Sequence, residues 1–323
     1  MLSQNYKTIA IVVFVVSLIL GMIHASNIDV ASILGMGGSE ESETDAGNDA
    51  SAAGSCVMTE TISEILMQFY EEHQLRGGIS IAVSRNERLV FAGSVGYADS
   101  NHTVRLLPEH RMRIGSLSET ITVIAAMKLL EEGKLSLDDL VFERNNVFDN
   151  ESNIRIIERK SGMTYEEFVR ENILKPSGID GMRFCANFSG SDEAEYITSG
   201  RAPAGTGVSP GWVANPIELL KILVRIDGFS NVKDILSRET INIMTNPNAF
   251  GWRLAQAGSS WFHTVNLAGT SSVMGRSSNG FNWVILINYS PRTFARADFN
   301  RGMDDLFWQI HRAVREWPAG TEL

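Results

Sequence analysis

The sequence predicts an α/β (α+β) fold in which N- and C-terminal strands share one antiparallel sheet flanked by helices. The first observation is the order of patterns: strand-like alternation within 78–96, helical periodicity through the middle, then strand-like segments within 260–288 and a last helix. The second is that 44% of the 323 residues are hydrophobic, enough to bury one large core. We therefore expect one such domain over 57–323, with a helical lobe in its middle.

The domain is expected to open with a helix and a hairpin. Over 59–75, apolar residues recur on one helical face, and the runs 78–84 and 88–96 flank a polar turn, Arg85-Asn86-Glu87. A further helix is predicted within 114–133, where a buried stripe ends at Gly133. The stripe consists of Ile121, Ile124, Ala125, Leu129 and Leu130.

The rest of the domain alternates helices, a loop and strands. Further helices are expected at 153–160, 164–175, 216–226 and 237–244. Thr164 and Glu167 form a capping-box pattern at the start of the second of these. A Gly-, Ser- and Pro-rich loop is expected at 189–211, strands at 260–265, 270–275 and 281–288, and a final amphipathic helix at 297–317.

The N-terminal residues read as a targeting segment. An apolar run over 9–23 follows Lys7, and its length suits the core of a signal peptide or an uncleaved signal anchor. Cleavage near Ala25 is one outcome and retention as an anchor is the other. Both place the following chain in the secretory pathway, outside the cell or on the outer face of a membrane. We therefore assign residues 1–25 to a signal peptide or signal anchor.

The next segment, 26–56, is predicted to be an acidic, disordered linker. It is rich in Gly, Ser and Ala and has no aromatic residue, so it cannot bury enough apolar surface to offset its conformational entropy. The first 56 residues also hold about half of the net charge of −10. The remaining domain is only mildly acidic, which argues against nucleic acid as a partner.

An oxidising compartment bears on the cysteines and on glycosylation. Cys56 and Cys185 are the two cysteines, and they either form one disulfide or remain separate thiols. Three sequons begin at Asn101, Asn150 and Asn187, and a fourth at Asn288 is weakened by the proline that follows it. A glycoprotein is therefore expected if the host glycosylates these sites.

From about Gly77 to Tyr289 the chain resembles the serine β-lactamase-related family, which includes class C β-lactamases, penicillin-binding DD-peptidases and related esterases. The resemblance is carried by GGISIAVSRNERLVFAGSVGYAD, LLEEGKLSLDD, SGMTYEEFVRENILKPSGIDGM, PGWVANPIELLKIL and WFHTVNLAGTSSVMGRSSNGFNWVILINY. It implies a nucleophilic serine and a lysine in an SxxK motif at a helix start. It also implies a tyrosine in a YxN element and a strand reading Lys or His, Ser or Thr, then Gly. Members of the family normally carry a longer helical insert between the positions of Asp139 and Ser161, so the resemblance implies a shortened helical lobe here.

The first of these motifs departs from the family at its base. The match is Ser116-Leu117-Ser118-Glu119, so a carboxylate replaces the lysine that would accept the serine proton. Negative charge there opposes the developing oxyanion. Since SxxE is also a capping box, we expect Ser116 to act mainly as the helix cap. The alternative is that Ser116 is a residual nucleophile and Glu119 an unusual base.

The other two motifs also differ from the family. Phe148-Asp149-Asn150 is the nearest match to YxN, and a phenylalanine lacks the relay hydroxyl; the alternative is that Phe148 is an ordinary core or loop aromatic. The strand motif reads His263-Thr264-Val265, so a branched side chain stands where glycine would admit substrate. The resemblance implies oxyanion donors at the backbone N–H groups of Ser116 and Asn266.

These departures predict a divergent, catalytically impaired or inactive family member that binds or scaffolds, with a small-molecule or peptide ligand in the remnant cleft. The alternative is a slow serine esterase or amidase that uses Ser116, with proton transfer through Glu119, His263 or water. A third possibility is that the short segment 145–150 reflects an incomplete gene model. No GxSxG, Walker, GxGxxG, HExxH or paired CxxC motif occurs, and nothing requires a cofactor or metal.

Overall fold

The computed structural model of this chain describes residues 46–142, 149–185, 192–195, 197–198, 211–245, 250, 252–255, 260–291 and 296–323. From Asp49 onward these residues form one compact unit. The segments 1–25 and most of 26–56, to which the sequence assigns a targeting peptide and a linker, lie outside the described residues. Among those described, no helix has the length and apolar character to cross a membrane.

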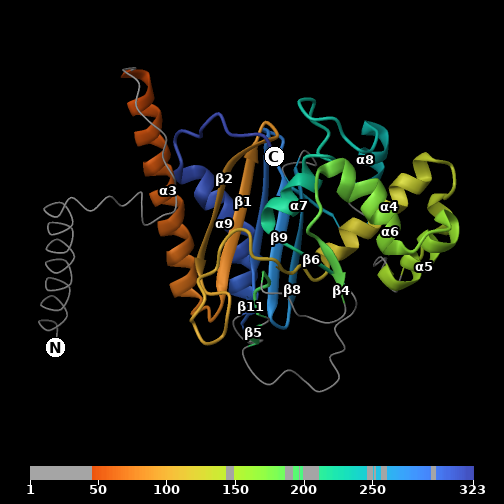
Figure 1. The fold of residues 1–323 in the computed structure, drawn as a ribbon, viewed down its shortest axis with the longest axis horizontal. Coiled ribbons are helices and arrows are strands. Elements are labelled where there is room, and N and C mark those ends of the chain that lie inside the picture. Colours follow the sequence, from red (N-terminus) through yellow and green to blue (C-terminus); the bar gives the residue numbers. More distant parts are fainter. Residues whose placement is uncertain are drawn as a thin grey trace, which may run out of the picture. The chain divides into compact units, whose positions relative to one another are not determined.

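A six-stranded antiparallel sheet forms the centre of this unit (Figure 1). Its order is β2 (Arg88–Gly96), β1 (Gly78–Arg85), β10 (Phe281–Ile287), β9 (Thr270–Arg276), β8 (Ser260–Leu267) and β7 (Arg253–Ala255). The first hairpin pairs with the C-terminal strands through β1 and β10, where Ile79 lies opposite Ile287. This confirms the predicted sheet built from both ends of the domain.

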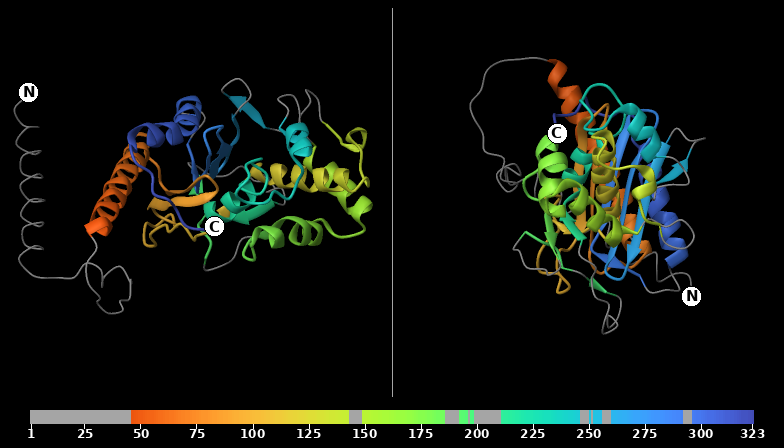
Figure 2. Two further views of the ribbon diagram at one scale, coloured as in Figure 1. Left: turned by 90° about the horizontal axis from the view of Figure 1, so that it is seen from above. Right: turned by 90° about the vertical axis from the view of Figure 1, so that its right-hand side faces the viewer.

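Two helices cover one face of the sheet, as Figure 2 shows from a second direction. They are α3 (Ala46–Glu72) and α9 (Arg296–Ala313). The apolar face of α3 that its periodicity predicted packs in one hydrophobic cluster with one side of α9. The side chains of β1 and β10 on this face of the sheet belong to the same cluster. Trp283 of β10 stacks on Phe307 of α9 with ring centroids 4.1 Å apart. Both helices are therefore held by the apolar stripes that predicted them.

The opposite face carries the helical lobe. Its elements are α4 (Leu117–Glu131), η1 (Leu137–Asp139), α5 (Asn150–Ser161), α6 (Tyr165–Val169), the π turn η2 (Arg170–Leu174), η3 (Lys175–Ser177), α7 (Pro216–Leu223) and α8 (Arg238–Met244). The helix α4 lies in the middle of this lobe and is buried nearly all round, beyond the single stripe that was expected. Thr164 and Glu167 form the predicted capping box of α6.

Two small sheets were missed by the sequence patterns. One has the order β3 (Met112–Arg113), β6 (Gly211–Ala214) and β4 (Arg183–Cys185), and it is antiparallel. The other pairs β11 (Tyr289–Ser290) with β5 (Ile197–Thr198) in parallel. Strands of two to four residues are too short to show an alternating pattern, so periodicity could not reveal them.

The start of α3 differs from the expected linker. The helix begins at Ala46, so its first residues fall within the segment 26–56. This part contains Ala46, Ala50, Ala52 and Ala53, and alanine has the strongest intrinsic preference for helix. A low apolar content therefore did not exclude local helix. Cys56, on the same helix, is an exposed free cysteine; the side chain of Cys185 lies outside the described residues.

Candidate functional site

Ser116 lies at the N-terminus of α4 with its backbone already in the helical region, at φ −68° and ψ −2°. A serine caps a helix from an extended conformation, as Thr164 does at φ −63° and ψ 152°. Ser116 accordingly makes no side-chain capping hydrogen bond. The prediction that Ser116 serves mainly as the cap is therefore wrong.

The backbone before Ser116 explains this difference. Gly115 has a φ of +57°, and the N–H groups of Leu117 and Ser118 already donate to the carbonyls of Ile114 and Gly115 at 3.2 and 2.9 Å. The helical turn thus begins before Ser116, and the N–H of Glu119 bonds the Ser116 carbonyl at 3.0 Å. The hydroxyl of Ser116 is consequently available for contacts other than capping.

Ser116 and Glu119 are both half-buried in the first turn of the helix. Residues three apart on a helix are neighbours on one face, so the carboxylate stands where the family has its basic lysine. The helix N-terminus would itself favour an oxyanion near Ser116.

A buried polar network anchors this end of α4 to the lobe. The Ser118 hydroxyl accepts from the backbone N–H of Trp212 at 2.9 Å, and the Trp212 indole donates to the Tyr165 hydroxyl at 3.1 Å. Thr122 shares a 2.9 Å hydrogen bond with the same hydroxyl. Burial raises the pKa of Tyr165 to about 12, so this phenol stays protonated and cannot act as a base near neutral pH.

The strand β8 presents His263 and Val265 on its face toward α4, because alternate residues of a strand share a face. His263 is buried, and its ring lies 6.3 Å from that of Trp252. Thr264 and Asn266 point the other way, where their side chains bond Asp304 and Asn300 of α9, each at 2.6 Å. The Asn266 side chain is thus directed toward α9, and the oxyanion role of its backbone N–H stays a prediction.

Val265 packs closely against Gly115, the residue before Ser116. A Cβ built on Gly115 would lie 2.8 Å from Val265 Cγ1 and 3.2 Å from Leu267 Cδ1, so both side chains rest on the residue that precedes the serine. Val265 is only 3% exposed. The sequence predicted crowding by Val265, but it gave no signal for Leu267, because that residue lies outside the motif.

Phe148, the residue in the tyrosine position of the second motif, lies outside the described residues. Its neighbours start a helix: the Asp149 carboxylate caps α5 by accepting from the Ser152 N–H at 3.0 Å, and Asn150 is the first residue of that helix. Asp149 therefore has a structural role as a helix cap.

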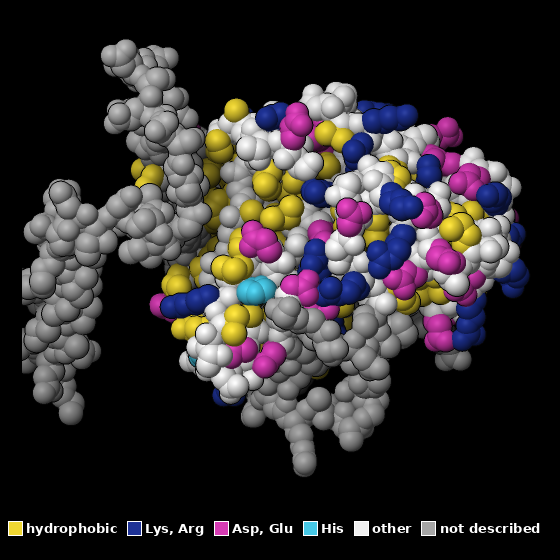
Figure 3. All heavy atoms as spheres, viewed as in Figure 1, with side chains coloured by type: hydrophobic (Ala, Val, Ile, Leu, Met, Phe, Trp, Pro, Cys, Tyr) yellow, Lys and Arg dark blue, Asp and Glu magenta, His cyan; other side chains and the backbone are white. Residues whose placement is uncertain are grey.

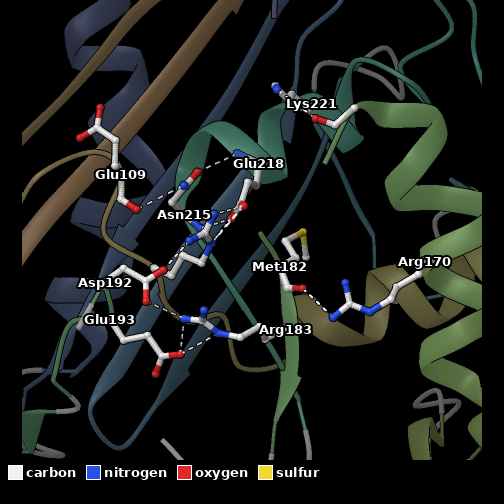
Figure 4. A network of polar contacts seen from close by, with 11 residues as sticks. Glu109, Arg170, Met182, Arg183, Asp192, Glu193, Asn215, Glu218 and Lys221 are labelled. Atoms are coloured by element: carbon white, nitrogen blue, oxygen red, sulfur yellow. Dashed lines mark hydrogen bonds and ion pairs between the residues drawn. The ribbon is translucent and has the colours of Figure 1, made fainter. Parts of the chain in front are cut away.

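A second polar feature is a network of charges at the base of the helical lobe (Figure 4). Arg111 bonds Glu218 of α7 through Nε, at 3.0 Å, and through its terminal nitrogen at 2.6 Å, and it also pairs with Asp192. Hydrogen bonding to Glu218 is the main cause that raises the pKa of Arg111. Arg183 extends the network to Asp192 and Glu193.

These charges are structural in character, since each arginine is paired with carboxylates and Glu218 also caps α7 with Asn215. No local motif pointed to the network, because Arg111 and Glu218 lie 107 positions apart in the sequence. On the face shown in Figure 3, basic and acidic side chains are interspersed over the helical lobe. Among the described residues, no cluster of histidine, cysteine and acidic side chains could hold a metal ion.

Comparison with known proteins agrees with this geometry. Residues 64–151 match the Beta-lactamase family model. A 61-residue segment is 44% identical to "Serine beta-lactamase-like protein LACTB, mitochondrial" from Homo sapiens, covering 19% of this chain and 11% of that protein, and the same match holds for the protein from Mus musculus. The chain thus spans about a tenth of the length of these relatives.

Solved structures extend the likeness to most of the fold. D-amino acid amidase from Ochrobactrum anthropi SV3, complexed with L-phenylalanine, has a TM-score of 0.66 at 17% identity, over 80% of this chain and 98% of that chain. The octameric penicillin-binding protein homologue from Pyrococcus abyssi has a TM-score of 0.62 at 18% identity, over 78% and 77% of the two chains. The chain is thus similar to serine β-lactamase-related proteins over residues 64–151, and it shares the fold of these solved structures.

Proposed function

We propose that this protein uses a serine hydrolase fold for binding or scaffolding and that its acyl-transfer chemistry is impaired or lost. The observation that carries the proposal is the packing of Val265 and Leu267 against Gly115, directly before Ser116. A carbonyl substrate must reach the serine hydroxyl beside β8. Apolar side chains already occupy the neighbouring surface.

The charge at Glu119 supports the same proposal. Attack by Ser116 Oγ on a carbonyl carbon makes an oxyanion and requires a base for the hydroxyl proton. A carboxylate can accept that proton, but its charge repels the oxyanion that forms beside it. Tyr165 offers no alternative base, because it is fully buried and hydrogen-bonded to Thr122 and Trp212.

One observation favours a second candidate, a slow esterase or amidase. The Ser116 hydroxyl is not used as a helix cap, and it lies at the positive end of the α4 dipole. In this mechanism Ser116 Oγ bonds the substrate carbonyl carbon while its proton passes to Glu119, His263 or water. The alcohol or amine then leaves with a proton, and water hydrolyses the acyl-enzyme.

We also propose a location for the protein and a class of ligand. The N-terminal segment would carry the domain into the secretory pathway or hold it on the outer face of a membrane, and the ligand of the remnant cleft would be a small molecule or peptide. The relatives named above leave these points open, since their match covers a short segment.

Labelling of the purified full-length chain with fluorescent penicillin and a fluorophosphonate tests the main proposal. We expect no increase in intact mass, as in the Ser116→Ala variant. For the second candidate, ester turnover by the wild-type chain should disappear in Ser116→Ala. Equal turnover by both proteins would remove the slow hydrolase, whereas turnover that depends on Ser116 would remove the binding-only proposal.

A further inference from the structure

A pocket of about 600 Å³ lies at the turn between β1 and β2, away from the Ser116 region. Its walls come from this turn, the end of α7 and the residues that follow it, Ser177 in η3, and the C-terminal residues. Those lining it are Asn86, Glu87, Arg88, Ser177, Lys221, Val224, Arg225, Asn231, Val232, Glu322 and Leu323. None of the residues assigned to the remnant site is among them.

Three cationic side chains line this pocket, and all of them bond carbonyl oxygens. Arg88 donates from Nε and its terminal nitrogen to the Gly320 carbonyl at 3.1 and 2.9 Å. Lys221 donates to the Gly178 carbonyl at 3.2 Å (Figure 4), and Arg225 to the Lys233 carbonyl at 2.9 Å. In the described part of the chain, none of the three forms an ion pair.

Lys221 and Arg225 have further N–H groups that these hydrogen bonds do not use. A lysine ammonium has three N–H groups and an arginine guanidinium has five. The bonds described above use one donor each of Lys221 and Arg225. Asp234 partly offsets the charge of Arg225, whereas the partner of Lys221 is a neutral carbonyl. An arginine can also bind a carboxylate or phosphate with two parallel hydrogen bonds.

The carboxylates of the pocket do not remove this charge by pairing. Glu87 is 2% exposed, and its two oxygens accept the backbone N–H groups of Asn231 and Val232 at 2.7 and 2.9 Å. Its role is to hold the 231–232 loop against the hairpin turn. Glu322 is exposed at the rim and lies within reach of solvent.

We propose that this pocket binds a small organic oxyanion, with its acidic head group on Lys221 and Arg225. The apolar body of the ligand would rest on Val224 and Val232. A carboxylate and a phosphate monoester share the chemistry that these donors recognise.

The test is a ligand-observed NMR titration of the full-length chain with phenyl phosphate, benzoate and neutral benzyl alcohol. We expect saturable binding of one or both anions and none of the alcohol, and the preferred head group distinguishes phosphate from carboxylate. Lys221→Gln and Arg225→Gln should each weaken binding about tenfold. Glu322→Gln should strengthen it about twofold, because it removes a nearby negative charge.

Two controls separate the site from folding and from general charge. Lys221→Gln and Arg225→Gln should each unfold within about 1 kcal/mol of the wild type, because each loses a single hydrogen bond to a carbonyl. Arg312→Gln, on the exposed face of α9, should leave binding unchanged. The proposal is overturned if neither anion saturates by about 10 mM. It is equally overturned if the alcohol binds as well as the anions, or if Arg312→Gln weakens binding as much as the pocket variants.

Discussion

Replacing Asp227 by asparagine should raise the stability of the protein, and only at higher pH. Asp227 is 1% exposed; its Oδ1 accepts from the Phe229 N–H at 2.8 Å and its Oδ2 from the Asn282 amide at 2.7 Å. Burial raises the pKa of this carboxyl to about 7, and the charges of Glu87 and Asp234 act in the same direction. The folded protein therefore holds a proton that the unfolded chain releases.

The direction and the magnitude of the pH dependence of stability follow from this pKa shift. A pKa that is higher in the folded state gives stability that is fully present below the unfolded value of 3.8 and is lost as the pH rises through about 7. A shift of roughly three units corresponds to at most about 4 kcal/mol. The folded protein carries this penalty in full only above about pH 7.

Asp227→Asn removes the titration and can keep the local bonds. The new amide oxygen can still accept from the Phe229 N–H, while the new amide nitrogen would face the donor of Asn282. Turning the Asn282 side chain over presents its Oδ1, which is buried and has no partner in the structure. The variant should thus match the wild type near pH 4 and exceed it by up to about 4 kcal/mol near pH 8.

Urea unfolding at a series of pH values measures this difference in the free energy of unfolding. Asp305→Asn, an exposed change on α9, is the matched control and should stay within about 0.5 kcal/mol of the wild type. A gain from Asp227→Asn that does not vary with pH, or that falls as the pH rises, would refute the reasoning.

Two further predictions concern stability and are read by thermal or urea unfolding. Ser116→Ala should change the free energy of unfolding by less than about 0.5 kcal/mol, because no capping bond is lost, whereas Thr164→Ala, which removes a formed capping box, should cost about 1 kcal/mol. A larger loss for Ser116→Ala would restore the capping interpretation. Arg111→Gln should cost about 3 kcal/mol, because it leaves the buried Glu218 carboxylate without its cation; a loss below about 1 kcal/mol would contradict a structural role.

Long periodic segments allowed most of the fold to be predicted. The hairpin of β1 and β2 and the strands β8 to β10 were expected from strand-like runs bounded by turn residues, and the helix α9 from its apolar stripe. What the sequence could not show depends on distant contacts or very short elements. The strand pairs β3 with β6 and β5 with β11 are examples, as is the ion pair of Arg111 and Glu218.

The candidate site shows why a correct motif can be misread. Thr164 and Ser116 both precede a glutamate by three positions, yet only Thr164 forms the capping box. The difference lies in the preceding residue: Gly115 at φ +57° starts the turn early and brings Ser116 into it. A four-residue pattern contains no information on that backbone angle.

We propose that Ser116 is not acylated efficiently, because Glu119 opposes the oxyanion and because Val265 and Leu267 pack against Gly115 directly before it. The most direct test is peptide mapping by mass spectrometry after prolonged incubation of the full-length chain with a fluorophosphonate. The peptide that contains Ser116 should be recovered unmodified, at the same yield as in the untreated protein. Recovery of a covalent adduct on Ser116 would contradict the claim.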